Sequence, residues 1–241
     1  MRVAIHQPNY FPWMGFWRKV AQADVCILLD TVQYSKGSYT NRVQCLSPAG
    51  PRWLTIPVHV PVGTTMTDVW PAQQTWSDTH LNILREWYRD APLFQDFFPL
   101  VQQWIRTAPQ ADLATINEGL IRTVADWLGL TTRFVCASEL GVGSTDRTGR
   151  LVDLCQRVGG ASGTYLTGRG GLAYLEQAQF EQVSWRVQAV LHDGCDAYSV
   201  LHYGFHCYPQ TAEGGLSRLG PSGRIDNPEH ERMLEGKRGD T

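Results

Sequence analysis

The chain has 241 residues, of which 43% are hydrophobic and 18% are charged, and its formal net charge at pH 7 is −2. This apolar content excludes disorder of the whole chain, and the lack of a basic excess argues against electrostatic binding to nucleic acid. No window approaches the roughly 18 consecutive apolar residues of a membrane span, and the N-terminus lacks a signal-peptide core, so we expect a cytoplasmic globular protein with reduced cysteines.

The first third of the chain predicts strands alternating with a helix. Residues 3–5 form a short apolar run, and a helix can begin at Gly15. Residues 25–29 are continuously apolar, as in a strand that is buried on both faces. A β-hairpin is expected next, with strands at 41–46 and 53–58 separated by a cluster of turn-forming residues.

The middle of the chain predicts helices. Ser77 or Asp78 can cap one helix, and Asp112 precedes a second, more regular amphipathic pattern that stops at Gly129. The last third alternates again: strands are expected at 133–137, 164–166 and 185–191, and helices at 146–158 and 171–177. Such alternation predicts parallel strand pairing with right-handed crossovers.

These elements predict an α/β fold with a mostly parallel sheet flanked by helices. We expect a single domain over residues 1–213, with an N-terminal β-hairpin insertion and a helical middle segment at about 77–130. Residues 214–241 are rich in glycine and polar residues, so we expect them to form a loosely held tail.

Two polar residues follow the first two predicted strands. If these strands are parallel neighbours about 4.8 Å apart, His6 and Asp30 lie at the same edge of the sheet, where open α/β sheets bind ligands. A histidine beside a carboxylate suits acid–base catalysis, so His6 is the candidate general base and Asp30 the residue that orients it. The alternative is structural, because an Asp after a strand often forms a turn or cap.

Two nearby segments suit anion recognition. Lys36, Asn41 and Arg42 place two cations and an amide in a loop that is rich in Gly, Ser and Tyr. The glycine-rich block 163–171 lies between a strand and a helix, and its backbone amides could hold a phosphate with help from Arg169. It is neither a P-loop nor a regular GxGxxG motif, and a tight strand-to-helix turn is the alternative.

Five metal-ligand residue types lie close together in the sequence: His192, Cys195, His202, His206 and Cys207. Tetrahedral zinc needs several of them to converge on one point. Residues 201–207 have the pattern of a strand, in which side chains four residues apart are separated by about 13 Å. We therefore expect no metal site.

Several blocks resemble the WbqC-like protein family. Residues 5–42, IHQPNYFPWMGFWRKVAQADVCILLDTVQYSKGSYTNR, resemble the opening signature of that family, and residues 147–175, RTGRLVDLCQRVGGASGTYLTGRGGLAYL, resemble its second block. A third block, YPQ followed by LS, is similar too, but the segment after Ser217 departs from the acidic, apolar helix that is usual in the family. The positions that match are His6, Gln7, Pro8, Tyr10, Pro12, Asp30, Gln33, Tyr34, Lys36, Asn41, Arg42, Tyr165, Gly168 and Tyr174.

The resemblance implies a bacterial protein of surface-polysaccharide or specialised-metabolite biosynthesis. Together with His6 and Asp30 it favours acyl or aminoacyl transfer to an amino group of a (nucleotide-)sugar or related small molecule, with an acyl thioester or nucleotide-linked co-substrate. Nucleotidyl transfer and a non-catalytic ligand-binding subunit remain open alternatives, as does the oligomeric state. The candidate substrate-binding residues are Gln7, Asn9, Tyr10, Tyr34, Lys36, Asn41, Arg42, Tyr165, Gly168, Arg169 and Gly170.

Overall fold

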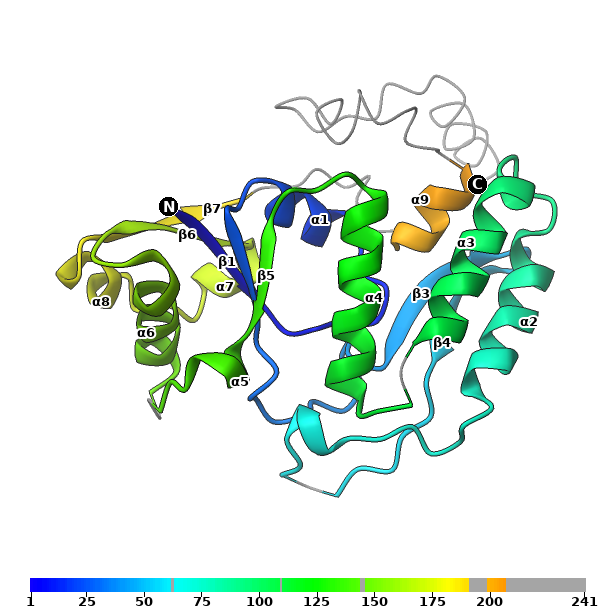
Figure 1. The fold of residues 1–241 in the computed structure, drawn as a ribbon, viewed down its shortest axis with the longest axis horizontal. Coiled ribbons are helices and arrows are strands. Elements are labelled where there is room, and N and C mark those ends of the chain that lie inside the picture. Colours follow the sequence, from blue (N-terminus) through cyan, green and yellow to red (C-terminus); the bar gives the residue numbers. More distant parts are fainter. Residues whose placement is uncertain (62, 109, 144–145, 191–198, 207–241) are drawn as a thin grey trace, which may run out of the picture.

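Five short strands pair in parallel into one sheet, in the order β5-β2-β1-β6-β7 (Figure 1). The structure is a computed structural model, and it describes residues 1–61, 63–108, 110–143, 146–190 and 199–206. This sheet, with helices on both faces, confirms the expected α/β class. Its strands are β1 (Arg2–His6), β2 (Val25–Leu28), β5 (Arg133–Cys136), β6 (Gly163–Thr167) and β7 (Trp185–Ala189).

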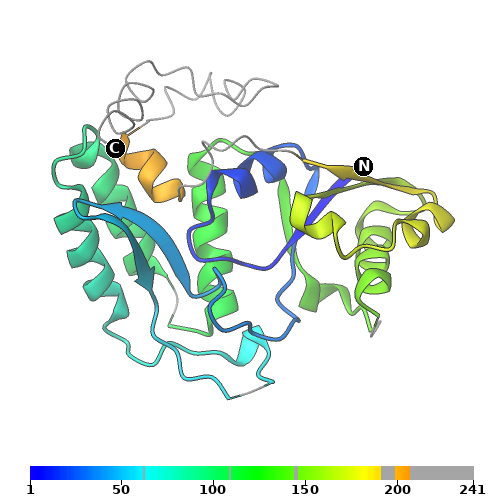
Figure 2. The ribbon, with the colours of Figure 1, turned by 180° about the vertical axis from the view of Figure 1, so that it is seen from behind.

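The two faces of the sheet belong to different hydrophobic clusters. Ala4 and Cys26 pack on the face that carries α1 (Met14–Ala21) and share a cluster with α4 (Leu113–Trp127). Their strand neighbours point the other way and pack against α6 (Arg147–Gly159) and α8 (Gln177–Gln182). Figures 1 and 2 show these helices on opposite sides of the sheet. The short apolar strands predicted from sequence are therefore buried on both faces, as parallel strands usually are.

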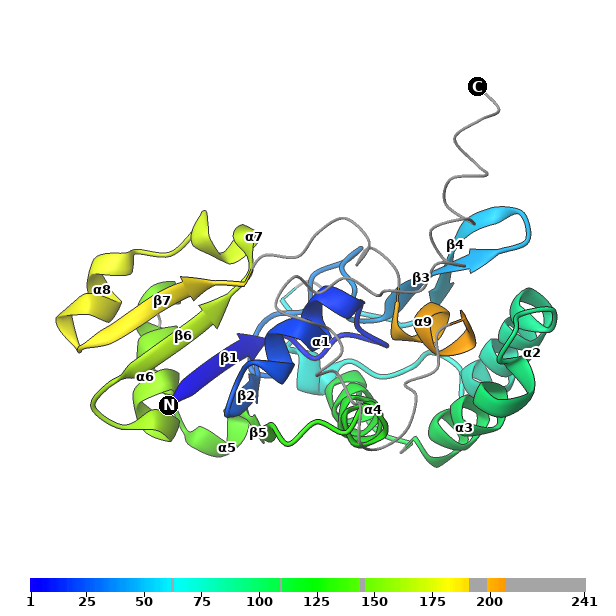
Figure 3. The same cartoon turned by 90° about the horizontal axis from the view of Figure 1, so that it is seen from above.

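A long insertion between β2 and β5 adds a second layer of elements. It contains an antiparallel hairpin of β3 (Arg42–Ser47) and β4 (Gly50–Thr55), and Figure 3 shows this hairpin beside the helices at the end of the molecule opposite α8. The expected hairpin is confirmed, but its second strand starts three residues earlier, because Gly50 and Pro51 pair with β3 instead of forming the turn. The other elements here are a 3-10 helix η1 (Met66–Asp68), α2 (Trp76–Tyr88) and α3 (Phe94–Thr107).

Aspartate caps begin two of the longer helices, as the sequence predicts. The Asp112 side chain accepts a hydrogen bond from the Thr115 amide at 3.0 Å at the start of α4, and Asp146 accepts one from the Gly149 amide at the start of α6. Two short helices, α5 (Ala137–Leu140) and α7 (Arg169–Leu172), follow the carboxyl ends of β5 and β6. In the described ranges, no helix is both long enough and apolar enough to cross a bilayer. The predicted tail at 214–241 lies outside those ranges.

The strand expected at 201–207 is wrong, because residues up to 206 form helix α9 (Val200–His206). Alternating apolar residues favour a strand here, yet the helix buries Leu201 and Phe205, which are spaced as on one helical face. Gly204 permits close packing on α3: a Cβ atom at this position would lie 2.0 Å from the ring of Phe97. The small side chain is therefore a packing requirement of the helix pair.

We expect Gly204→Ala to lower the free energy of unfolding by about 1–3 kcal/mol, because the added methyl group overpacks a buried contact. Chemical denaturation followed by tryptophan fluorescence measures this change. Gly143→Ala is the matched control, since a Cβ there meets no atom within 4 Å. Equal stability of the two variants would contradict the packing of α9 on α3.

Candidate functional site

The order of the strands creates a crevice at the carboxyl ends of β1 and β6. The chain adds β2 and β5 on one side of β1, then returns to add β6 and β7 on the other side. In doubly wound sheets, ligands bind where the strand order reverses in this way. A cavity of about 890 Å³ opens at this point, and both His6 after β1 and Gly168 after β6 line it.

Four cationic side chains line this cavity, which we call the switch-point cavity: Lys19 from α1, Arg147 and Arg150 from α6, and Arg169 from α7. Because α1 and α6 cover opposite faces of the sheet, positive charge enters the cavity from both layers. Among the described residues of the cavity wall there is no Asp or Glu. This charge pattern favours an anionic ligand, since clefts of one sign concentrate ions of the opposite sign.

His6 has a fixed tautomer. Its Nδ1 lies 2.9 Å from the backbone oxygen of Gln7, and a carbonyl oxygen can only accept, so Nδ1 carries the proton. The Nε2 atom makes no hydrogen bond to the described part of the chain. The ring packs edge-on against Trp13 and Phe16, with centroid distances of 5.6 and 5.2 Å. The lone pair on Nε2 is therefore left for a ligand.

The pKa of His6 is lowered to about 3, mainly because the ring is buried and also because the Lys19 ammonium is nearby, while the hydrogen bond to Gln7 acts in the opposite direction. Lys19 is itself only 6% exposed and donates a hydrogen bond from Nζ to the backbone oxygen of Ile5 at 3.2 Å. Burial lowers the pKa of Lys19 to about 8, with the Cys26 thiol acting in the opposite direction. At neutral pH the cavity therefore contains a neutral imidazole beside an ammonium ion.

Asn9 contributes an amide that the fold itself does not use. It is only 5% exposed and lines the switch-point cavity, but its side chain makes no hydrogen bond to any described residue. Buried polar side chains in native structures nearly always have a hydrogen-bond partner. This amide therefore marks a place where a polar ligand group would be bound.

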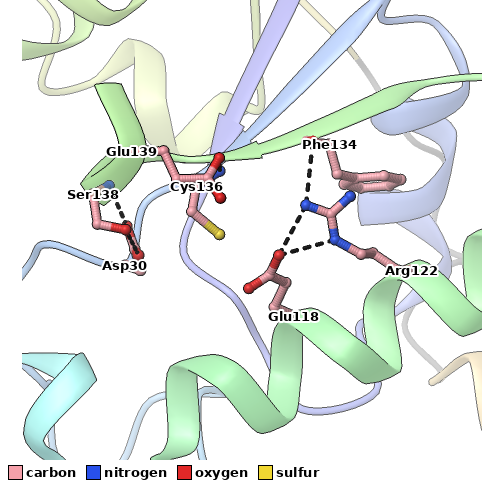
Figure 4. A network of polar contacts seen from close by, with 7 residues as sticks. All are labelled: Asp30, Glu118, Arg122, Phe134, Cys136, Ser138 and Glu139. Carbon is pink, nitrogen blue, oxygen red and sulfur yellow. Dashed lines mark hydrogen bonds and ion pairs between the residues drawn. The ribbon is translucent and has the colours of Figure 1, made fainter. Parts of the chain in front are cut away.

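Asp30 lies outside this cavity, and its contacts are structural (Figure 4). Its carboxylate accepts hydrogen bonds from the Ser138 amide at 3.0 Å and the Ser138 hydroxyl at 2.5 Å, at the start of α5. It lines a separate cavity of about 170 Å³ with Glu118, Cys136 and Glu139, whereas its neighbour Leu29 lines the larger cavity. The expected His6–Asp30 pair in one crevice is therefore wrong, because the chain turns after β2 and directs Asp30 to the end of β5.

The rest of the polar network in Figure 4 fastens helices to the sheet. Arg122 of α4 forms an ion pair with Glu118 at 2.8 Å and donates a hydrogen bond to the Phe134 carbonyl of β5 at 3.2 Å. Glu139 accepts a hydrogen bond from the Cys136 amide at 3.3 Å, which completes a capping box at α5. These contacts satisfy backbone groups of Phe134 and Cys136 at the end of β5.

Comparison with known proteins agrees with the resemblance seen in the motifs. The model of the WbqC-like protein family matches residues 7–208. The chain belongs to this family. It is also similar to uncharacterized protein Rv1507c of Mycobacterium tuberculosis (strain ATCC 25618 / H37Rv), with 29% identity over 212 residues that cover 85% of this chain and 88% of the relative. No solved structure gives a significant match.

In this WbqC-like protein, the cavity gathers only some of the candidate binding residues. Those that line it, besides His6, are Gln7, Asn9, Tyr165, Gly168, Arg169 and Gly170. Tyr10 is buried and its hydroxyl bonds to Nδ1 of His80 at 2.8 Å, and Asn41 donates to the Ile56 carbonyl at 2.9 Å. Arg42 bonds to the Gly37 carbonyl and lies over the Trp53 ring, while Tyr34 and Lys36 are absent from the cavity wall. Lys36, Asn41 and Arg42 therefore lie off the cavity wall, although Ser38 and Tyr39 of the same loop line it.

Sequence reasoning missed Lys19, Arg147 and Arg150. A usable signal was present at α6, because the first turn contains no acidic residue and arginines occupy its first and fourth positions. Cations near the N-terminus of a helix oppose the helix dipole, so this placement favours a function outside the helix. Lys19 gave no comparable signal, since a lysine within an amphipathic helix is usually solvated.

The expected separation of His202 and His206 on a strand is also wrong. They lie on helix α9, and their ring centroids are 4.3 Å apart. In the part of the chain that the structure describes, no group of three or more His, Cys, Asp or Glu side chains is placed to bind a metal ion. The other three residues of the proposed cluster, at positions 192, 195 and 207, lie outside that part.

We expect Asp30→Ala to destabilise the protein by about 1–3 kcal/mol, because two donors of Ser138 would lose their acceptor. Asp153→Ala, an exposed aspartate on α6, is the matched control and should change stability by less than about 0.5 kcal/mol. Urea denaturation measures both effects. A variant at Asp30 as stable as the control would refute the structural role.

We expect His6 to remain neutral, with its proton on Nδ1, throughout pH 5 to 8, and long-range ¹H–¹⁵N NMR spectra report this tautomer directly. Lys19→Met should raise the pKa of His6, because it removes the ammonium charge that disfavours imidazolium. Lys36→Met, an exposed lysine outside the cavity, should have no such effect. A histidine signal that titrates near pH 6.5 at this position would contradict the tautomer and charge state described above.

Proposed function

We propose that this WbqC-like protein is a transferase that moves an acyl or aminoacyl group onto the amino group of a small molecule, such as an amino sugar that carries a nucleotide. The observation that carries the proposal is the neutral imidazole of His6, with its proton held on Nδ1 and its Nε2 open to a cavity lined by four cations. The residues retained from the sequence are His6, Gln7, Asn9, Tyr165 and the Gly168–Gly170 loop.

The chemistry requires a base, and His6 supplies it. Nε2 accepts a proton as the amine nitrogen attacks the carbonyl carbon of an acyl thioester, and a C–N bond forms. The carbonyl oxygen becomes an oxyanion that the Lys19 ammonium stabilises electrostatically. The C–S bond then breaks, the carbonyl reforms, and the leaving thiolate takes the proton from the imidazolium. The product is an amide and a free thiol.

The orientation of the base differs from the one expected from sequence. A backbone carbonyl, that of Gln7, takes the place of Asp30 in holding the Nδ1 proton. The low pKa of the free His6 keeps the imidazole unprotonated before substrate binds. An anionic ligand next to Lys19 offsets the ammonium charge and raises the pKa of His6, so that the base becomes stronger once the substrate is bound.

Nucleotidyl transfer is the second candidate. It is favoured by the phosphate-compatible charge at the switch point of a doubly wound sheet, the location at which such sheets bind nucleotides. It predicts release of pyrophosphate from a nucleoside triphosphate. Binding without turnover of any donor would instead identify a non-catalytic subunit.

The test is turnover with panels of acyl thioesters and amino-sugar nucleotides, followed by mass spectrometry of the amide product. With an active pair in hand, we expect His6→Ala and His6→Gln to lower kcat at least 100-fold, because each lacks the general base. His59→Ala, an exposed histidine, is the matched control and should retain wild-type turnover. Full activity of His6→Ala would contradict the proposal that His6 is the general base.

The pH profile gives an independent prediction. We expect kcat/KM to be level from pH 5 to pH 8 and to fall above about pH 8, where Lys19 loses the proton that makes it a cation. Lys19→Arg should move this alkaline limb upward, because arginine stays protonated. An unchanged limb in that variant would show that another group titrates.

A further inference from the structure

The switch-point cavity draws its positive charge from two layers of the fold, and this feature is not explained by acyl transfer itself. We propose that the cavity binds its co-substrate through the diphosphate group of a nucleotide, which lies across the edge of the sheet between Lys19 of α1 and Arg147 and Arg150 of α6. This inference rests on the proposed function in using the same cavity, but it concerns recognition and not the transferred group.

Two cationic side chains at the start of α6 interact unfavourably with the helix dipole. Arg147 and Arg150 lie in the first turn of the helix, where the positive end of the helix dipole disfavours cations. Asp146 caps this helix by accepting a hydrogen bond from the Gly149 amide, and it is not among the residues that line the cavity. An anion in the cavity would reverse this unfavourable arrangement, since both arginines line the cavity wall.

Lys19, on the opposite face of the sheet, is also a cation in an unfavourable environment beside the cavity. Its ammonium is almost fully buried and donates a hydrogen bond to the neutral carbonyl of Ile5, and no carboxylate of the described residues forms an ion pair with it. Buried charges are stable when they are paired. The buried amide of Asn9, which has no hydrogen bond to the described chain, adds a hydrogen-bonding group to the wall of the same cavity.

The loop between these two cationic sides leaves room for the ligand to approach the backbone. Gly168 and Gly170 do not have the positive φ angles that demand glycine, and a Cβ atom at either position would meet no atom within 4 Å. Neither backbone conformation nor packing therefore requires glycine here. Contact between the backbone and a bound phosphate gives a reason for it, as in other glycine-rich loops at strand ends.

Charge balance favours a diphosphate over a single phosphate. Four cations face the cavity without a carboxylate among the described lining residues, whereas a phosphate monoester carries about −1.5 to −2 at pH 7. A second phosphate also lets the ligand contact both layers, since β1 and β6 lie about 4.8 Å apart at the edge between them. The exposed ring of Tyr174, 5.8 Å from the Arg147 guanidinium carbon, offers a face at the rim for the attached nucleoside.

Two sources supply this chemistry, a sugar nucleotide as acceptor or an acyl coenzyme A as donor, because both contain a nucleoside diphosphate group. Isothermal titration calorimetry at fixed ionic strength distinguishes them with inorganic phosphate, pyrophosphate, UMP, UDP and coenzyme A as probes. We expect pyrophosphate to bind at least tenfold more tightly than phosphate, and UDP or coenzyme A to bind more tightly than pyrophosphate. The tighter of the last two identifies the source.

Matched variants locate the site. Arg147→Gln, Arg150→Gln and Lys19→Met should each weaken pyrophosphate binding at least tenfold, while Arg157→Gln, an exposed arginine at the far end of α6, should leave it unchanged. Tyr174→Ala should weaken the nucleotide probe at least threefold and leave pyrophosphate unaffected. Denaturation curves establish that each variant is folded.

Two results would overturn the proposal: a preference for pyrophosphate over phosphate of less than tenfold, or wild-type binding by Arg147→Gln together with Arg150→Gln. The outcome is separate from that of the transfer proposal. If His6→Ala retains full turnover while the arginine variants lose binding, the catalytic role fails and the diphosphate site stands. If His6 is essential and pyrophosphate does not bind, the diphosphate site fails and the catalytic role of His6 stands.

Discussion

The placement of β1 between β2 and β6 is the constraint on which the rest of the molecule depends. Because its two neighbours are connected through opposite layers, the loops that leave β1 and β6 diverge, and the space between them cannot be filled by a crossover. His6 ends β1 and so projects into that space from a strand paired on both sides. Strand ends thus position the imidazole that we propose as the base, while helices from both layers provide the charge.

The electrostatics of the cavity follow from burial more than from any single partner. Burial keeps the His6 imidazole neutral and weakens the hold of Lys19 on its proton, so that a base and a cation coexist a short distance apart. In water the same two groups would interact weakly. A ligand that neutralised the cation would raise the pKa of the imidazole, and in the proposed reaction this would link ligand binding to the strength of the base.

Local sequence patterns located the strands of the sheet and the cap of α4 well, because continuous apolar runs and an aspartate before a helix act over a few residues. The cap expected at Ser77 or Asp78 is wrong, because α2 begins at Trp76 with Thr75 before it. Local patterns also failed at α9, where alternating apolar residues match a strand and only the contact of Gly204 with Phe97 reveals a helix. The site was half predictable: His6 and the Gly168 loop follow strands that end at the switch point. Asp30 and Arg147 could not be assigned, since strand order and helix layering, which no local pattern encodes, decide where they lie.

The insertion between β2 and β5 has a consequence for how the chain assembles. Leu28 pairs with Cys136, so the edge of the sheet closes only after the hairpin and three long helices have been synthesised. Loop-closure entropy rises slowly with length, by about 0.6 kcal/mol per doubling, so the separation slows assembly far more than it weakens the finished fold. During synthesis, the edge of β2 that pairs with β5 therefore stays unpaired until β5 has been made. In that interval the inserted helices can cover the apolar surface of the incomplete sheet.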